Sequence, residues 1–189
     1  MHDALGEILA KRRLEAVLPH VRGRLLDLGC GDNKLVRRYE NGVGVDVHPW
    51  RGADLVVPDS SSLQWEAETF DTITIIAALN HMPNRAAVLR ECRRVLRADG
   101  QMVVTMLTPR TSRIWHWLRG QRDADQRERG MKPGEVYGFL PGEIIDLFAS
   151  SGFTLASQKR FMCGLNRVYV FKPVAAIPYP APIDQKKAS

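Results

Sequence analysis

The chain has 189 residues, of which 44% are apolar and 25% charged, and its formal net charge is +6 at pH 7. These values are ordinary for a folded globular protein and exclude fibrous, collagen-like and wholly disordered chains. No apolar stretch approaches the roughly 20 residues that a transmembrane helix needs. The first residues lack the basic start and apolar core of a signal peptide, and the three cysteines have no CxxC spacing. We therefore expect reduced thiols and a cytoplasmic location.

Helices and strands are predicted to alternate along the chain. An apolar stripe predicts an N-terminal helix over 3–18, and similar patterns predict helices over 33–40, from Asn84 up to the Asp99-Gly100 turn, and over 141–150. Short apolar runs predict strands at 24–28, 42–47, 54–57, 70–77, 101–107, 153–159 and 166–171. Near-continuous apolar strands separated by helices predict an α/β fold: a doubly wound, mostly parallel seven-stranded sheet with helices on both faces.

The predicted organisation is one catalytic domain over residues 1–172, followed by a Pro-containing tail over 173–189 that we expect to be mostly unpacked. Within the domain, 1–20 is the N-terminal helix and 108–137 is an irregular insertion on the substrate side. In such a sheet a ligand binds outside the carboxyl ends of the strands, where the strand order reverses. The ends of the first, second and fourth strands are therefore the places to examine.

Two glycines stand where the first strand turns into a helix, in Leu25-Leu26-Asp27-Leu28-Gly29-Cys30-Gly31-Asp32-Asn33. Glycine lets the backbone approach a ligand closely, and we expect free N–H groups of the turn to point at it. The last position of a G-x-G-x-x-G dinucleotide fingerprint is Lys34 here, and no Walker-type sequence occurs, so NAD and P-loop sites are disfavoured. The alternative is a turn that merely packs strand against helix.

The second strand ends at Asp46. A carboxylate at this place can accept both hydroxyls of a ribose that lies across the glycine turn. Alternatively, Asp46 is a turn or cap residue.

The order of motifs over residues 20–172 resembles the class I S-adenosylmethionine-dependent methyltransferases, in particular a small single-domain family of the methyltransferase type 11 kind. The motifs are the Asp27–Gly31 turn, Asp46, Asp59 with Leu63, the Phe70-Asp71 strand entry, His81 after the fourth strand, and the Arg-Val-Leu-x-x-Asp-Gly run at 94–100. Asn33 stands where the family usually has a small residue, and asparagine tolerates positive φ.

The resemblance implies a Rossmann-like methyltransferase fold with S-adenosyl-L-methionine as cofactor. It implies that Gly29 and Gly31 lie against the methionine portion and ribose, and that Asp27 helps to hold the amino group. Asp59 and Ser60 would meet the adenine, and Leu79 would border the adenosine or the methyl-transfer channel. The implied cofactor-binding residues are Asp27, Gly29, Cys30, Gly31, Asp46, Val47, Asp59, Ser60, Ala77 and Leu79.

Methyl transfer from a sulfonium is an in-line displacement in which alignment supplies much of the rate enhancement. An acceptor hydroxyl or amine would profit from a base, and His81 is the best placed by sequence, since imidazole titrates near neutral pH. Alternatively, His81 caps a helix or shapes the pocket wall. No HxxxH or CxxC cluster occurs, so we expect no metal.

The insertion at 108–137 combines aromatic and basic side chains that suit an apolar or aromatic acceptor with an anionic group. The candidate acceptor-binding residues are Arg110, Arg113, Trp115, Trp117 and Tyr137. We therefore expect a methyltransferase acting on a small-molecule or lipid-linked acceptor.

Two alternatives remain open at this stage. Residues 85–132 hold twelve basic and five acidic residues, a field that would suit an RNA-directed methyltransferase, although a solvated helix face explains such a run more simply. The other alternative is a protein that binds the cofactor without catalysis.

Overall fold

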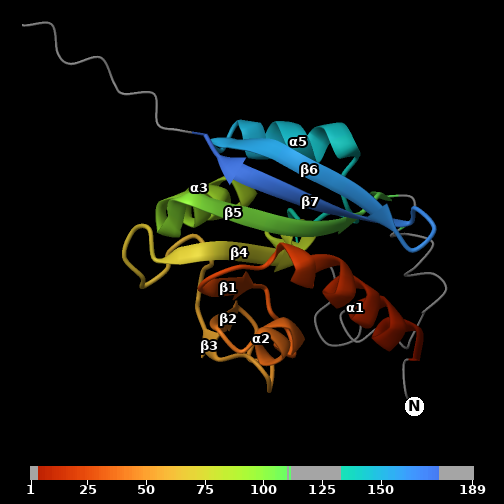
Figure 1. Ribbon diagram of the computed structural model, residues 1–189, viewed down its shortest axis with the longest axis horizontal. Helices are drawn as coiled ribbons and strands as arrows, with labels where there is room; N and C mark the ends of the chain where they lie inside the picture. Colours follow the sequence, from red (N-terminus) through yellow and green to blue (C-terminus); the bar gives the residue numbers. More distant parts are fainter. Residues whose placement is uncertain (1–3, 110, 112–132, 175–189) are drawn as a thin grey trace, which may run out of the picture.

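The computed structural model describes residues 4–109, 111 and 133–174, and they form one twisted sheet with helices on both faces (Figure 1). The helices of the described residues are α1 (Ala4–Val17), η1 (Leu18–His20), α2 (Lys34–Tyr39), η2 (Leu79–His81), α3 (Arg85–Val95) and α5 (Pro141–Ala149). The strands are β1 (Leu25–Leu28), β2 (Gly42–Asp46), β3 (Leu55–Val56), β4 (Phe70–Ile76), β5 (Leu96–Leu107), β6 (Phe153–Phe161) and β7 (Asn166–Pro173).

The described strands form a seven-stranded sheet in the order β3-β2-β1-β4-β5-β7-β6. Strands β1 to β5 pair in parallel, and β7 is antiparallel to both β5 and β6. The predicted doubly wound, mostly parallel sheet is therefore confirmed. Because the chain moves from β1 to β2 on one side and later to β4 on the other, β1 lies at the point where the strand order reverses.

Each face of the sheet has its own apolar core. Side chains of α3 and α5, such as Val88 and Phe148, pack with Leu26 and Ile73 on one face. Val17 of α1 and the buried side chains of α2 pack on the other face with Leu25, Val103 and Val168. Because helices cover both faces of the sheet, the strands are apolar runs rather than alternating apolar and polar residues.

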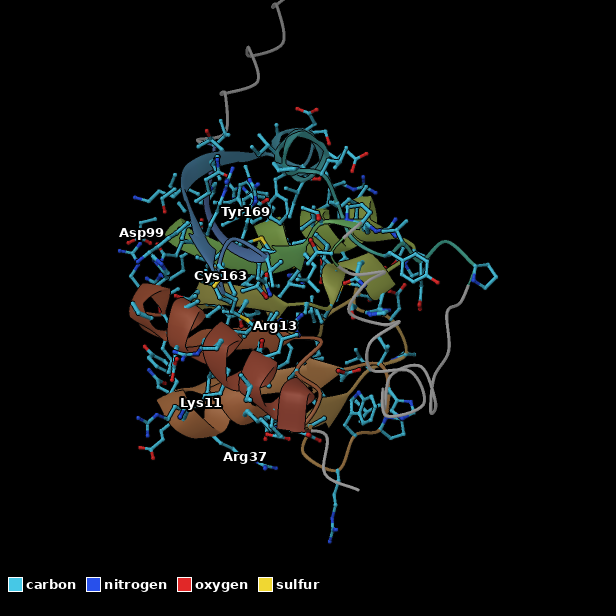
Figure 2. All side chains as sticks on the ribbon, turned by 90° about the vertical axis from the view of Figure 1, so that its right-hand side faces the viewer. Lys11, Arg13, Arg37, Asp99, Cys163 and Tyr169 are labelled. Carbon is cyan, nitrogen blue, oxygen red and sulfur yellow. The ribbon has the colours of Figure 1, made fainter. Side chains whose placement is uncertain are left out.

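Helix α1 lies along the α2 face of the sheet (Figures 1 and 2). Leu9 and Val17 are buried, whereas Ala10 and Leu14 of the predicted stripe are half-buried. Both residues line a cavity at the end of the sheet, and Leu14 also packs against the core of this face. The N-terminal helix therefore packs on the sheet and also contributes part of a cavity wall.

Several predicted boundaries differ from the structure, and the differences in β5 and β7 have clear causes. Strand β5 begins at Leu96, not at 101, and its pairing with β4 shifts register where the turn at Asp99-Gly100 was predicted. Strand β7 continues to Pro173, where we predicted the start of an unpacked tail, because the Val174 N–H donates to the carbonyl of Gly152. Within the described residues, no helix has the length and apolar content required to cross a membrane.

Candidate functional site

A cavity of about 760 Å³ opens at the carboxyl ends of β1, β2 and β4, where the topology predicts a ligand site. Its volume lies within the roughly 300–1,000 Å³ typical of ligand pockets. The predicted residues among its described lining are Asp27, Gly29, Cys30, Gly31, Asp46, Val47, Asp59, Ser60, Ala77 and His81. The sheet thus brings together side chains from positions 27 to 81 of the sequence.

The glycine turn combines tight packing with an open approach to the cavity. Gly29 and Gly31 both have positive φ, 76° and 52°. A Cβ on Gly29 would collide with the side chain of Ala78, whereas a Cβ on Gly31 would meet no described atom within 4 Å. Gly29 is therefore needed for packing, and Gly31 leaves room for a ligand to contact the backbone.

The N–H groups of this turn are engaged within the protein, which corrects the expectation that they are free. The N–H groups of Gly29 and Cys30 both donate to the carbonyl of Val45, at 2.8 and 3.1 Å, and the Gly31 N–H donates to Asp46 Oδ2 at 3.0 Å. A bound phosphate would need N–H groups that are not already hydrogen-bonded within the protein. The turn therefore suits the close approach of a ligand to its backbone rather than anion binding.

Asp46 is buried beside the turn, with 8% of its surface exposed. Besides the bond from Gly31, its Oδ1 accepts the N–H of His48 at 2.9 Å. Each carboxylate oxygen can accept a second hydrogen bond, so the fixed carboxylate retains acceptor capacity for two hydroxyls. Asn33, the N-cap of α2, adopts the expected positive φ of 59° and packs against Gly44 of β2, the strand that ends at Asp46.

Asp27 lies deeper in the same wall and is 2% exposed. Its Oδ1 accepts a hydrogen bond of 2.6 Å from the Thr74 hydroxyl. Burial raises the pKa of Asp27 to about 7; the Thr74 bond opposes this shift and the charge of Asp46 adds to it. Burial, with the nearby charges of Asp27 and Asp46, also raises the pKa of Cys30, so that thiol stays protonated and is no nucleophile.

Beyond β2, the cavity wall contains an aromatic side chain that the sequence analysis did not single out. Trp50 lines the cavity and makes an edge contact with the ring of His48, with centroids 4.4 Å apart. Asp59 and Ser60 line the same cavity. Bonds from the side chain and N–H of Ser61, and from Asn84, lower the pKa of Asp59, so its carboxylate is charged.

The cavity is acidic overall. Its described lining contains four aspartates and Glu135 against Arg13 and Lys34, and the Lys34 ammonium lies 3.0 Å from a carboxylate oxygen of Glu7. Arg13 lies on the side of α1 nearer the sheet, and Lys11 lies on the outer side (Figure 2). Such a lining favours a ligand that carries positive charge over one that carries phosphates.

His81 shares this cavity with an acidic partner that the sequence analysis missed. Its Nδ1 lies 3.1 Å from Oε2 of Glu135, and the side chains are 16% and 0% exposed. The two residues are 54 positions apart, and Glu135 lies in a segment without regular secondary structure. No sequence motif signals this pair.

Leu79 does not line the cavity, in contrast to the prediction. Its side chain is 0% exposed and belongs to the core on the α3 face. The reason is η2: with three residues per turn, Ala78 and His81 share the cavity side and Leu79 turns away.

Of the predicted acceptor-binding residues, Arg110, Arg113, Trp115 and Trp117 lie outside the described residues. Tyr137 lies in a second cavity of about 930 Å³, together with Arg85, Arg90 and Phe139. The two cavities share Pro83, Asn84 and Glu135 in their linings. They therefore meet beside the His81–Glu135 pair. Within the described residues, no group of three or more His, Cys, Asp or Glu side chains is arranged to hold a metal ion.

Comparison with known proteins gives a consistent answer. A family model described as a methyltransferase domain matches residues 26–104. The demethylmenaquinone methyltransferase of Thermotoga maritima is 25% identical over 197 aligned positions, which cover 85% of this chain and 86% of that protein. The ubiquinone biosynthesis O-methyltransferase of Hahella chejuensis is 26% identical over 157 positions, covering 69% and 66%. These matches, together with the fold, show an S-adenosylmethionine-dependent methyltransferase that is similar to the class I enzymes.

The fold of this methyltransferase is shared with solved structures of low sequence identity. The 1,6-didemethyltoxoflavin-N1-methyltransferase of Burkholderia thailandensis, crystallised with its acceptor and S-adenosylhomocysteine, has a TM-score of 0.66 at 18% identity. The match covers 92% of this chain and 82% of that one. A methyltransferase of Thermotoga maritima has a TM-score of 0.63 at 16% identity, covering 86% and 88%. At these identities the likeness shows the fold alone.

The described residues fit the cofactor of this methyltransferase, S-adenosylmethionine. It carries a sulfonium and an ammonium, which suit the acidic lining, and it has no phosphate to require the engaged N–H groups of the turn. The open space at Gly31 and the acceptor capacity of Asp46 suit its ribose. Asp27 would face the ammonium, and Trp50 with Asp59 would flank the adenine.

Proposed function

We propose that this methyltransferase methylates a hydroxyl group of a small quinol-like or phenolic acceptor, and that His81 removes the hydroxyl proton. The observation that carries the proposal is the contact of 3.1 Å between His81 and Glu135 in the wall of the cavity that contains the glycine turn. When bound, the cofactor supplies a methyl group on a sulfonium, which the acceptor oxygen attacks from the opposite side. The products are the methyl ether, S-adenosylhomocysteine and one proton.

His81 would hold that proton at Nε2. A hydrogen bond from Nδ1–H to the Glu135 carboxylate fixes the tautomer in which Nε2 carries the lone pair. The Glu135 carboxylate also stabilises the imidazolium that forms when Nε2 takes the proton. Because this carboxylate is 0% exposed, water screens its charge weakly.

The second cavity and the relatives support the acceptor class. The reacting hydroxyl has to reach His81, and the second cavity continues past Glu135 toward Tyr137 and Phe139, which can contact a ring or an apolar chain. The two relatives described above act on demethylmenaquinone and in ubiquinone biosynthesis. Both observations favour a ring-bearing small molecule over a macromolecule.

We retain one catalytic domain, predicted over residues 1–172 and extended to Pro173 by β7, since a single sheet includes β1 to β7, and we retain 108–137 as the substrate-side insertion. The end of that insertion, residues 135–137, lines the second cavity, which supports its placement beside the acceptor.

The described part of the basic segment does not favour an RNA acceptor. Arg85, Arg93, Arg94 and Arg97 each contact a carbonyl or carboxylate of the chain itself. Side chains engaged in this way are less available to phosphates.

The test of the catalytic role is methyl transfer from methyl-tritiated cofactor to two probes, 1,4-dihydroxynaphthalene and catechol. We expect His81→Ala to lower kcat by about 10²–10⁴-fold, because general-base catalysis contributes that much. Glu135→Gln keeps a hydrogen-bond acceptor but removes the charge, so its kcat should fall less. The affinity for S-adenosylhomocysteine, measured by calorimetry, should stay within about twofold in both variants.

His20→Gln is the matched control, since His20 lies in η1 outside the described lining of either cavity. Turnover of His81→Ala within a factor of about two of the wild type would show that His81 is not the base and only forms part of the cavity wall. Failure of the wild-type enzyme to methylate either probe would contradict the acceptor class.

A further inference from the structure

Arg85, the first residue of α3, joins two chain segments that are far apart in sequence. Its Nε donates to the carbonyl of Leu79 at 3.3 Å, and its terminal nitrogen Nη2 donates to the carbonyls of Asn80 at 3.5 Å and Gly134 at 2.6 Å. The same guanidinium lies over the ring of Phe139, 5.3 Å from its centroid. One side chain therefore ties the loop after β4 to the segment that returns from the insertion.

The two tied segments carry the His81–Glu135 pair. Asn80 directly precedes His81, and Gly134 directly precedes Glu135. A backbone bond of 3.0 Å from the Val136 N–H to the carbonyl of Asn80 adds a second link beside the first. Since residues 135–140 have no regular secondary structure, their position depends on such ties.

The chemistry of arginine suits this position better than that of lysine. A planar guanidinium presents five N–H donors in a fixed fork and stacks on an aromatic ring, whereas an ammonium is a compact charge on a flexible stem. Burial lowers the pKa of Arg85, while the charge of Glu135 opposes this shift, and the guanidinium remains charged. Its charge therefore also offsets the cost of burying the Glu135 carboxylate.

We propose that Arg85 is the positioning residue of the catalytic pair: it holds Glu135 within hydrogen-bond distance of His81 Nδ1 and thereby selects the tautomer that leaves Nε2 as base. Arg85 acts through the backbone of both segments and is not a catalytic residue. The proposal rests on the proposed function, because it concerns the base of that reaction.

The experiment compares Arg85→Met and Arg85→Lys with Arg93→Met. Arg93 is the matched control, since it lies on the same helix and donates to a backbone carbonyl, that of Val174, away from the two cavities. Long-range ¹H–¹⁵N correlation spectra at about pH 8, with S-adenosylhomocysteine added, report which ring nitrogen of His81 carries the proton. The His81 signals are assigned by their absence from the His81→Gln spectrum.

We expect the Nδ1–H tautomer in the wild type and in Arg93→Met. Arg85→Met should shift the population toward Nε2–H and lower kcat for 1,4-dihydroxynaphthalene by about 10–100-fold, as misplacement of a catalytic group by an ångström does. The affinity for S-adenosylhomocysteine should stay within about threefold, because Arg85 is absent from the lining of the first cavity. Arg85→Lys, which can reach one carbonyl, should lie between the wild type and Arg85→Met.

An unchanged tautomer together with kcat within about twofold of the wild type in Arg85→Met would overturn the proposal. If Arg85→Met does not fold, Arg85→Lys decides: full kcat and the wild-type tautomer in that variant overturn the proposal, and a partial loss of both supports it. Failure of the proposed function can be distinguished from failure of the proposal for Arg85. If His81 is not the base, turnover is unimpaired in His81→Ala, whatever the result for the Arg85 variants.

Discussion

Replacing Asp27 with asparagine separates its contribution to cofactor binding from its cost to folding. Burial raises the pKa of this carboxyl from 3.8 to about 7, so near neutral pH the folded protein without ligand holds it about half protonated. If the cofactor ammonium binds beside Asp27 as proposed, it binds the ionised form of this carboxyl. Binding below about pH 7 should therefore release close to one proton from Asp27.

The size of the effect on affinity follows from that pKa. If the ammonium keeps Asp27 ionised in the complex, the association constant scales with the ionised fraction of the free protein. That fraction rises about fivefold between about pH 6 and about pH 7. Above about pH 8 the ammonium itself loses its proton, so affinity should pass through a maximum.

The stability of the protein without ligand should fall as the pH rises, whereas the cofactor affinity should rise. With a pKa raised on folding, the carboxyl stabilises the native state most below the unfolded pKa, and this contribution is lost as pH rises through the folded pKa. The loss amounts to about 4 kcal/mol over about pH 4 to 7. Asp27→Asn has no carboxyl to titrate and therefore lacks this loss of stability. We expect this variant without ligand to be more stable than the wild type at about pH 8, yet to bind the cofactor more weakly.

The assay is titration calorimetry of S-adenosylmethionine at several pH values, in buffers of different ionisation enthalpy, beside urea unfolding of both proteins. Thr74→Val is a useful second variant: it removes the bond that lowers the pKa of Asp27, so the rise in affinity should move to higher pH. An affinity that is flat from about pH 6 to about pH 8 in the wild type, or a slope that persists in Asp27→Asn, would refute the reasoning.

Three further outcomes are expected. Gly31→Ala should weaken cofactor binding by tenfold or more at a stability cost of roughly 1–2 kcal/mol, whereas Gly29→Ala should lose more stability because its Cβ meets Ala78. Calorimetry measures the cofactor affinity and urea unfolding the stability, and equal stability losses in the two variants would contradict the roles assigned to the two glycines. The cofactor should quench Trp50 fluorescence, and persistence of the change in Trp50→Phe would count against this contact. Asp46→Ala should cost about 1.5–3 kcal/mol of cofactor affinity for each ribose bond lost, and an unchanged affinity would remove Asp46 from the site.

The sequence determined the features that depend on neighbours along the chain. Apolar runs between helical stretches predicted every strand of the described sheet, because covered parallel strands need apolar side chains on both faces. The two glycines and Asp46 were recognisable because a strand that turns tightly into a helix, and a carboxylate at the next strand end, are local patterns.

The tertiary structure decided what depends on groups distant in sequence. Glu135 faces His81 and Arg85 joins the two segments only through the return of the chain after β5, which no periodicity encodes. The raised pKa of Asp27 requires burial on all sides, and the engaged N–H groups of the glycine turn require β2 beside it. Leu79 lies in the core rather than in the cavity wall, because the turn of η2 sets the direction of its side chain. The order of motifs thus predicted most of the residues that line the cavity, and the contacts between segments decided which partners surround them.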